Sequence, residues 1–307
     1  MITSALFKAK ARAVLQNHWQ TALLIALIVN LPTLLVQGIG AFTHNDLLTR
    51  VEDLMLDAAY STAAMESLPA SVRALFSETG ILIVLGLNVL AWLITPVLSL
   101  GMNHWTLDRI RGEEEPVTTV FSRLRIFLKG IGLRLWIALN ILLWMLPGIT
   151  ATVLAMLPLM NADPTDAQAV SSAMNTSSLL IWFGMTLMVV LGVIGYLRFA
   201  MADFILADEP EERVLSCARR SKMLMKGRSG ALAMLLLSFL MWYLLIIFVT
   251  SIIAGIAGDI IALVIQMLGS LFLSVYMLTS QGVFYEALRM TKDAPLQPQS
   301  PEDAGIS

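Results

Sequence analysis

The chain has 307 residues, of which 57% are hydrophobic and only 14% are charged, and its net charge is -2. A soluble domain carries about 25% charged residues, whereas several apolar runs here reach the roughly 18–20 residues that span a bilayer core. Composition therefore excludes a soluble globular protein and predicts an all-α, polytopic membrane helix bundle. A single cysteine, Cys217, excludes an intrachain disulfide framework and a multi-cysteine metal site.

The first predicted element is a short basic helix that leads into a membrane span. Lys8, Lys10 and Arg12 precede an apolar run from Thr21 to about Phe42. This run is longer than the roughly 7–15-residue apolar core of a secretory signal, and no A-x-A-like cleavage site follows it. We therefore predict a retained first span.

Residues 43–79 are polar enough to lie outside the bilayer core. Leu47, Val51, Leu54 and Ala58 recur at helical spacing, with charged residues off that face. The pattern predicts an external amphipathic helix that packs against the spans, in preference to a lid over a ligand.

Six spans are predicted in all, arranged as three hairpins. The second to the sixth cover roughly residues 80–103, 130–148, 178–204, 230–253 and 260–283. The pair Pro147-Gly148 predicts that the third span stops or breaks there. Residues 158–177 hold no Lys or Arg and are rich in polar residues, which predicts an external loop.

Two basic amphipathic helices are predicted between the spans. They cover residues 118–129 and 211–226, the second with a glycine, Gly227, placed to end it. Asp208 is positioned to cap a helix that begins near Pro210. Because both helices flank spans, their cations are expected to contact anionic lipid headgroups and not nucleic acid, at about 1 kcal/mol per basic residue. The predicted lipid-contact residues are Arg123, Arg125, Lys129, Arg219, Arg220, Lys222 and Lys226.

The distribution of basic residues predicts the orientation of the chain. On the six-span arrangement, 18 of the 20 Lys and Arg residues fall on one face, and only Arg50 and Arg73 fall on the other. Cytoplasmic segments are enriched in Lys and Arg, so both termini are expected in the cytoplasm.

A loose internal repeat is also predicted, in which a basic helix precedes each two-helix hairpin. The units cover residues 1–110, 115–208 and 209–290, within a single membrane domain of 1–290. Shared juxtamembrane composition is the alternative explanation of the similarity. Residues 291–307 are predicted to form a disordered cytoplasmic tail.

Several short motifs occur in a characteristic order and spacing. They are Leu98-Ser99-Leu100-Gly101, Arg111-Gly112-Glu113, the segments 143–149, 204–210 and 220–227, and Phe284-Tyr285-Glu286. In these motifs the chain resembles a bacterial membrane family catalogued as domain of unknown function 975, although residues 149–196 are longer than the family pattern. The resemblance implies a multi-pass protein of a bacterial cytoplasmic membrane, and it implies no activity.

The spans offer few groups for chemistry. None carries an acidic residue near its centre, where a charge costs roughly 2.5–3.5 kcal/mol or more and would mark a site, which weakens an ion-coupled carrier. No phosphate loop, nucleophile elbow or zinc motif is evident, so we expect neither an enzyme nor a cofactor.

A few polar residues lie within the apolar runs. Amides in spans commonly bond to neighbouring helices, and the alternative is a polar cavity formed by Asn30, Asn88, Asn140 and Arg198. Asp203 follows Arg198 by five residues and is expected to pair with it.

Three functions are compatible with these patterns. The first is a non-enzymatic membrane protein whose basic cytoplasmic helices contact anionic lipid, a membrane-protein partner or a second copy of the chain. The second is a transporter or export factor for a small amphipathic solute, which a continuous polar cavity would favour. A lipid-modifying membrane enzyme ranks lowest, because the sequence lacks a catalytic constellation.

Overall fold

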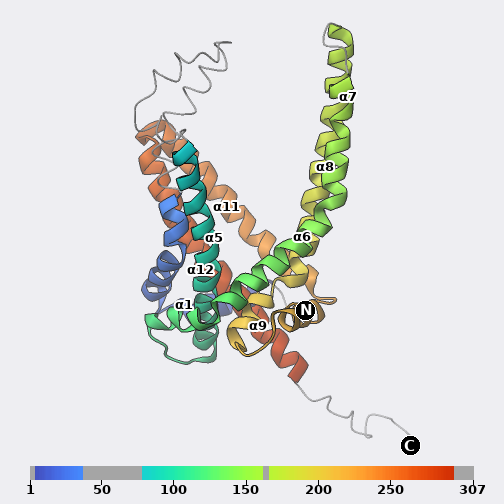
Figure 1. Ribbon diagram of the computed structural model, residues 1–307. Helices are drawn as coiled ribbons and strands as arrows, with labels where there is room; N and C mark the ends of the chain where they lie inside the picture. The colour runs from blue at the N-terminus through green and yellow to red at the C-terminus, as the bar shows by residue number, and fades with distance from the viewer. Residues whose placement is uncertain (1–3, 37–77, 162–165, 294–307) are drawn as a thin grey trace, which may run out of the picture.

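The computed structural model describes residues 4–36, 78–161 and 166–293 (Figure 1). Over these ranges the regular elements are helices, and six of them are long and apolar enough to cross a membrane, which confirms the predicted all-α multi-pass fold. The predicted amphipathic segment at 43–79 lies outside the described residues, except for its last two, and so does the tail beyond residue 293.

Each predicted span corresponds to a long helix. In chain order the elements are α1 (Ser4–Leu15), the first span (Trp19–Val36), α5 (Glu78–Arg111), the 3-10 helix η1 (Val117–Ile126), α6 (Phe127–Ala155), α7 (Leu157–Asn161), α8 (Ala167–Phe199), α9 (Ala202–Asp208), α10 (Val214–Leu224), α11 (Ser229–Ala257) and α12 (Asp259–Asp293). Gly227 follows α10 and Gly258 joins α11 to α12, both at positive φ, where a residue without Cβ is favoured.

The long helices form two arms that diverge from a common base (Figure 1). One arm contains the first span, α5, α11 and α12, and the other is the α6–α8 hairpin. The base includes α1 and α9, and α7 lies at the far tip of the second arm. Buried apolar side chains concentrate in the base, around Phe204, Leu206 and Phe284, and between the first span, α5 and α12.

The second arm exposes much of its apolar surface. Trp182 and Phe183 of α8 are 70% and 64% exposed, and the apolar windows of α6 and α8 are only 11% buried. In water such a surface would be unfavourable, whereas in a bilayer it meets the acyl chains. The arm is therefore built to stand in lipid.

The third and fourth spans are longer than the sequence predicts. α6 does not stop at Pro147-Gly148, and where the structure describes the expected loop at 158–177 it is mostly helical, in α7 and the first turns of α8. In an apolar solvent, unpaired backbone groups are expensive, so the helix continues through Pro147 and loses only the backbone hydrogen bond to the carbonyl of Leu143. Thr150 Oγ1 donates to the Pro147 carbonyl, and the backbone N–H of Gln168 donates to Asp166 Oδ1 at the start of α8.

The fourth span also breaks before its predicted end. α8 ends at Phe199, and α9 begins at Ala202. The hydroxyl of Ser221, a fully buried residue of α10, donates to the carbonyl of Arg198 at 3.1 Å and accepts from the N–H of Met201 at 3.2 Å. One side chain thus satisfies two of the backbone groups that the break releases.

Residues 118–129 do not form the predicted amphipathic α-helix. Most of the segment is the 3-10 helix η1, and α6 begins at Phe127. The carbonyl of Val120 lies so close to Gly101 of α5 that a Cβ at position 101 would overlap it. Thr119 also donates to Glu115 Oε2 at 2.9 Å, which fixes the start of η1. Docking on α5 therefore decides the local conformation.

Small residues form the seam between α6 and α8. A Cβ at Gly148 would overlap the backbone of Met188, and one at Gly184 would lie 2.8 Å from the backbone nitrogen of Thr152. Close backbone approach at small residues is a common means of packing helices where lipid supplies no hydrophobic driving force.

We predict that Gly148→Ala destabilises the α6–α8 hairpin, because overpacking a close helix contact costs about 1–3 kcal/mol. The measurement is the midpoint of thermal unfolding in detergent. The matched control is Gly86→Ala on α5, where a new Cβ meets no atom within 4 Å. Equal midpoints for the two variants would contradict the proposed seam.

Candidate functional site

A buried ion-pair network joins three helices at the base. Arg111, at the end of α5, donates to Asp208 at the end of α9 at 2.8 Å, and to Glu286 of α12. Arg289 and the hydroxyl of Tyr285 donate to the other oxygen of Asp208 at 2.9 and 3.2 Å. The carboxylates of Asp208 and Glu286 are only 7% and 6% exposed, so their charges depend on these donors.

Asp208 does not cap a helix near Pro210, as the sequence predicts. α10 begins only at Val214, and Asp208 ends α9 with its carboxylate bound to side chains from α5 and α12. Charged side chains from α5 and α12 bind the buried Asp208 carboxylate more strongly than a backbone N–H of its own segment could.

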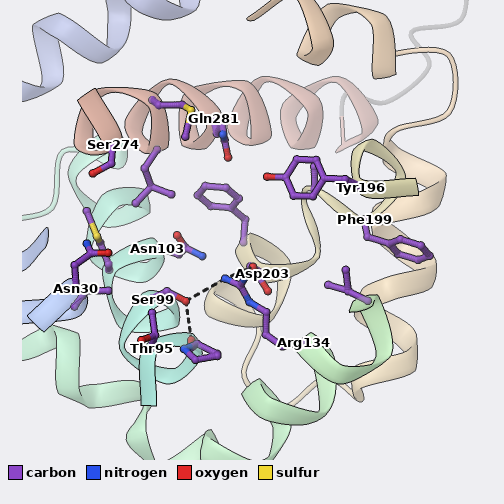
Figure 2. Close-up of a pocket in the computed structure, with 18 of the residues that line it drawn as sticks. Asn30, Thr95, Ser99, Asn103, Arg134, Tyr196, Phe199, Asp203, Ser274 and Gln281 are labelled. Atoms are coloured by element: carbon purple, nitrogen blue, oxygen red, sulfur yellow. Dashed lines mark hydrogen bonds and ion pairs between the residues drawn. The ribbon is translucent and has the colours of Figure 1, made fainter. Parts of the chain in front are cut away.

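A cavity of about 580 Å³ lies between the two arms, directly beside this base (Figure 2). Its walls come from the first span, α5, α6, α8, α9 and α12. The polar side chains that line it are Asn30, Thr33, Thr95, Ser99, Asn103, Arg134, Tyr196, Asp203, Ser274 and Gln281. This volume is in the range of small-molecule sites, and its mixed polar and apolar lining is typical of them.

An ion pair lies at the polar end of the cavity. Arg134 of α6 contacts Asp203 of α9 at 3.0 Å, and a second contact joins it to the hydroxyl of Ser99 at 3.4 Å (Figure 2). The Arg134 side chain is 44% exposed and that of Asp203 is 22% exposed, so a bound molecule could reach both charges. Asp203 therefore pairs with Arg134 and not with Arg198, whose guanidinium instead lies 4.4 Å from the Trp144 ring centroid.

Asn103 lies in the same wall and is only 3% exposed. Its Oδ1 atom has no hydrogen-bond partner among the described residues. Buried amide oxygens are nearly always bonded to protein, to ordered water or to a bound group, so the Asn103 oxygen leaves one acceptor beside the cavity for such a partner. In contrast, Asn30 donates to the carbonyl of Ala26 at 2.8 Å, and the hydroxyls of Thr33 and Thr95 lie 3.3 Å apart.

The structure brings together only part of the predicted polar cavity. Asn30 lines the cavity, and Asn88 lines a smaller neighbouring one that shares Thr33 and Trp92 with it. Asn140 donates to the carbonyl of Trp136 on its own helix, and neither Asn140 nor Arg198 belongs to the lining.

Sequence reasoning missed Asn103, Arg134, Asp203 and Gln281 as lining residues. One signal was present for α5, since Thr95, Ser99 and Asn103 recur every four residues and so share a helix face. The other contributors could not be found in this way, because they come from helices far apart in the sequence.

The predicted lipid-contact residues divide into two groups. Arg219 and Lys222 on α10, and Lys226 just after it, are exposed beside Leu215 and Met223, which are 55% and 57% exposed. The neighbouring Arg220 turns inward, donates to Glu209 at 3.0 Å, and pairs with Glu212 at 3.2 Å. The hydrogen bonds from Arg220 lower the pKa of Glu209, which keeps that carboxylate charged.

The same division holds around η1. Arg125 is exposed and lies among exposed apolar side chains, with Leu124 at 46% and Leu128 at 81%. Lys129 is instead held at the base, since its ammonium donates to the carbonyl of Pro210 at 2.7 Å. Arg123 is half-buried.

Within the described ranges, no group of three or more His, Cys, Asp or Glu side chains is placed to hold a metal ion. The six apolar helices define a multi-pass membrane helix bundle, with a cavity between its two arms. The chain belongs to the family described as "Protein of unknown function (DUF975)", whose model matches residues 1–292. A search of curated proteins and a search of solved structures each found no match.

We predict that Arg111→Gln destabilises the protein by about 3–5 kcal/mol, because it leaves Asp208 and Glu286 buried without their main cation. Thermal unfolding in detergent measures the loss. Arg125→Gln removes the same charge from an exposed position, where substitutions usually change stability by no more than about 0.5 kcal/mol. If the two variants unfold at the same temperature, the network does not hold the base together.

Proposed function

We propose that this chain is a non-enzymatic protein of a bacterial cytoplasmic membrane whose base faces the cytoplasm and contacts anionic lipid headgroups. One observation carries the proposal: exposed Leu215 and Met223 accompany the exposed cations of α10. An apolar and basic face on a helix that precedes a span suits the headgroup layer, where its apolar side chains enter the acyl boundary and its cations meet phosphates.

The distribution of charge along the arms supports this orientation. Residues 135–197, which form most of the second arm, contain no Lys or Arg, and neither do residues 229–288 of α11 and α12. The basic residues within the described ranges therefore gather at the base, and loops rich in Lys and Arg remain in the cytoplasm. The exposed apolar and basic face around Arg125 would form a second contact with the same lipid layer.

The cavity favours a second function, the binding and passage of a small amphipathic solute between the arms. Its support is the orphaned amide oxygen of Asn103 beside the accessible pair of Arg134 and Asp203. This function is compatible with the first, because the basic face and the cavity are formed by different residues.

Orientation can be tested by labelling introduced cysteines with a membrane-impermeant maleimide. The native Cys217 gives little background, because it is buried and burial raises the pKa of its thiol to about 12. We expect Asn161→Cys, at the tip of the second arm, to label in intact cells, and Lys226→Cys, at the base, to label only after permeabilisation. The reverse pattern would place the base outside the cell.

Lipid contact can be tested with two adjacent arginines. We expect Arg219→Gln to weaken the preference for phosphatidylglycerol roughly fivefold, since each cation near the surface contributes about 1 kcal/mol. Arg220→Gln should leave this preference unchanged, because Arg220 is paired with Glu209 and Glu212. Mass spectrometry of lipids retained in nanodiscs of mixed composition gives the ratio, and added salt should reduce it.

Equal lipid ratios in the two variants would contradict the proposed lipid contact. If Arg219→Gln instead released a co-purifying protein, or dissociated a dimer, without changing the lipids, the basic face would bind a protein partner or a second copy of this chain.

A further inference from the structure

The cavity between the arms has a polar end and an apolar end. Along α5 its lining runs from Asn103 to Trp92, a rise of roughly 16 Å, or about half of the hydrocarbon thickness of a bilayer. Along α6 it begins with Arg134 and continues with Ile137 and Ile141. On α6 the lining therefore becomes apolar with distance from the base, and on α5 it passes Thr95 and ends at Trp92.

The groups deeper along the cavity are already satisfied by protein. Thr95 donates to the carbonyl of Ala91 at 2.7 Å, and Asn30 bonds within the first span. Hydrogen-bonding capacity remains at the polar end, where Figure 2 shows Asn103, Ser99, Arg134 and Asp203 facing the same space. A ligand would therefore place its polar head at this end and its apolar part between the arms.

The polar end carries one cation and one anion, so its net charge is zero. A purely anionic head would be attracted to Arg134 and repelled by Asp203. A purely cationic head would be attracted to Asp203 and repelled by Arg134. A zwitterionic head can pair with both, replacing one ion pair by two. The oxygen of Asn103 additionally requires a donor, which a primary ammonium supplies.

We propose that this cavity binds a phosphate-ammonium head group, as in an aminophospholipid, with the acyl chains lying between the arms. The phosphate contacts Arg134, and the ammonium donates to Asp203 and to Oδ1 of Asn103. The inference deepens the second candidate function and rests on it, and it does not depend on the basic face of α10.

The test is native mass spectrometry of the full-length protein, titrated separately with three phospholipids that share the same chains. We expect phosphatidylethanolamine to bind roughly tenfold more tightly than phosphatidylcholine, whose trimethylated ammonium has no N–H, and more tightly than phosphatidylglycerol. Equal binding of the first two, or a preference for phosphatidylglycerol that Arg219→Gln does not reduce, would overturn the proposal.

Two variants test whether phosphatidylethanolamine binds in the cavity. Asn103→Leu and Asp203→Asn should each weaken phosphatidylethanolamine binding roughly tenfold, whereas Asn140→Leu, which changes an amide outside the cavity, should not. Thermal unfolding shows which variants are folded, and the comparison of lipids on the unaltered protein needs no variant. Unchanged binding by folded Asn103→Leu and Asp203→Asn would exclude the site.

Competition with free phosphoethanolamine distinguishes the two sources of this head group, a soluble zwitterion and a phospholipid. Displacement of bound phosphatidylethanolamine by the free compound would identify a soluble zwitterion as a sufficient ligand. Failure to compete, with lipid binding still sensitive to Asn103→Leu, would identify the lipid. If Arg219→Gln lost the preference for anionic lipid but still bound phosphatidylethanolamine, the change would be assigned to the basic face of α10, and the cavity proposal would stand.

Discussion

The architecture depends on the pairing of one cation, Arg111, with two buried carboxylates. Asp208 and Glu286 lie 97 and 175 residues from Arg111 in the chain, and each would be unfavourable at its position without a charged donor. The network thus couples α5, α9 and α12 at a single point. Because the apolar cluster around Phe204 and Phe284 packs beside it, the base is held by both charge pairing and apolar burial.

The two arms diverge from this base because their own contacts are internal. α6 and α8 hold each other through a seam at Gly148 and Gly184, which lets the hairpin stand in lipid without the support of the first arm. The space between the arms can therefore remain open to a ligand while the base stays fixed. The proposed amphiphile site would use this arrangement, since the polar head requires fixed partners and the apolar part requires only a path from the lipid.

Adjacent residues of α10 illustrate how tertiary contacts assign roles to similar side chains. Arg219 and Arg220 are identical in chemistry, yet one is exposed beside Leu215 and the other is bound by Glu209 and Glu212. A basic motif in the sequence is thus a mixture of cations that hold the protein together and cations that face its surroundings. Only the second kind can recognise a lipid headgroup.

The sequence by itself determined the number of spans and the turn at Gly227, because hydrophobic length and backbone freedom are local properties. It did not determine that α6 continues through Pro147 or that residues 117–126 form a 3-10 helix, since the lipid environment and docking on α5 decide those conformations. Nor could it assemble the cavity: Asn103, Arg134 and Asp203 meet only after three helices pack at the base. The physical reason is that ion pairing and burial depend on distances between residues remote in sequence, which only the tertiary structure decides.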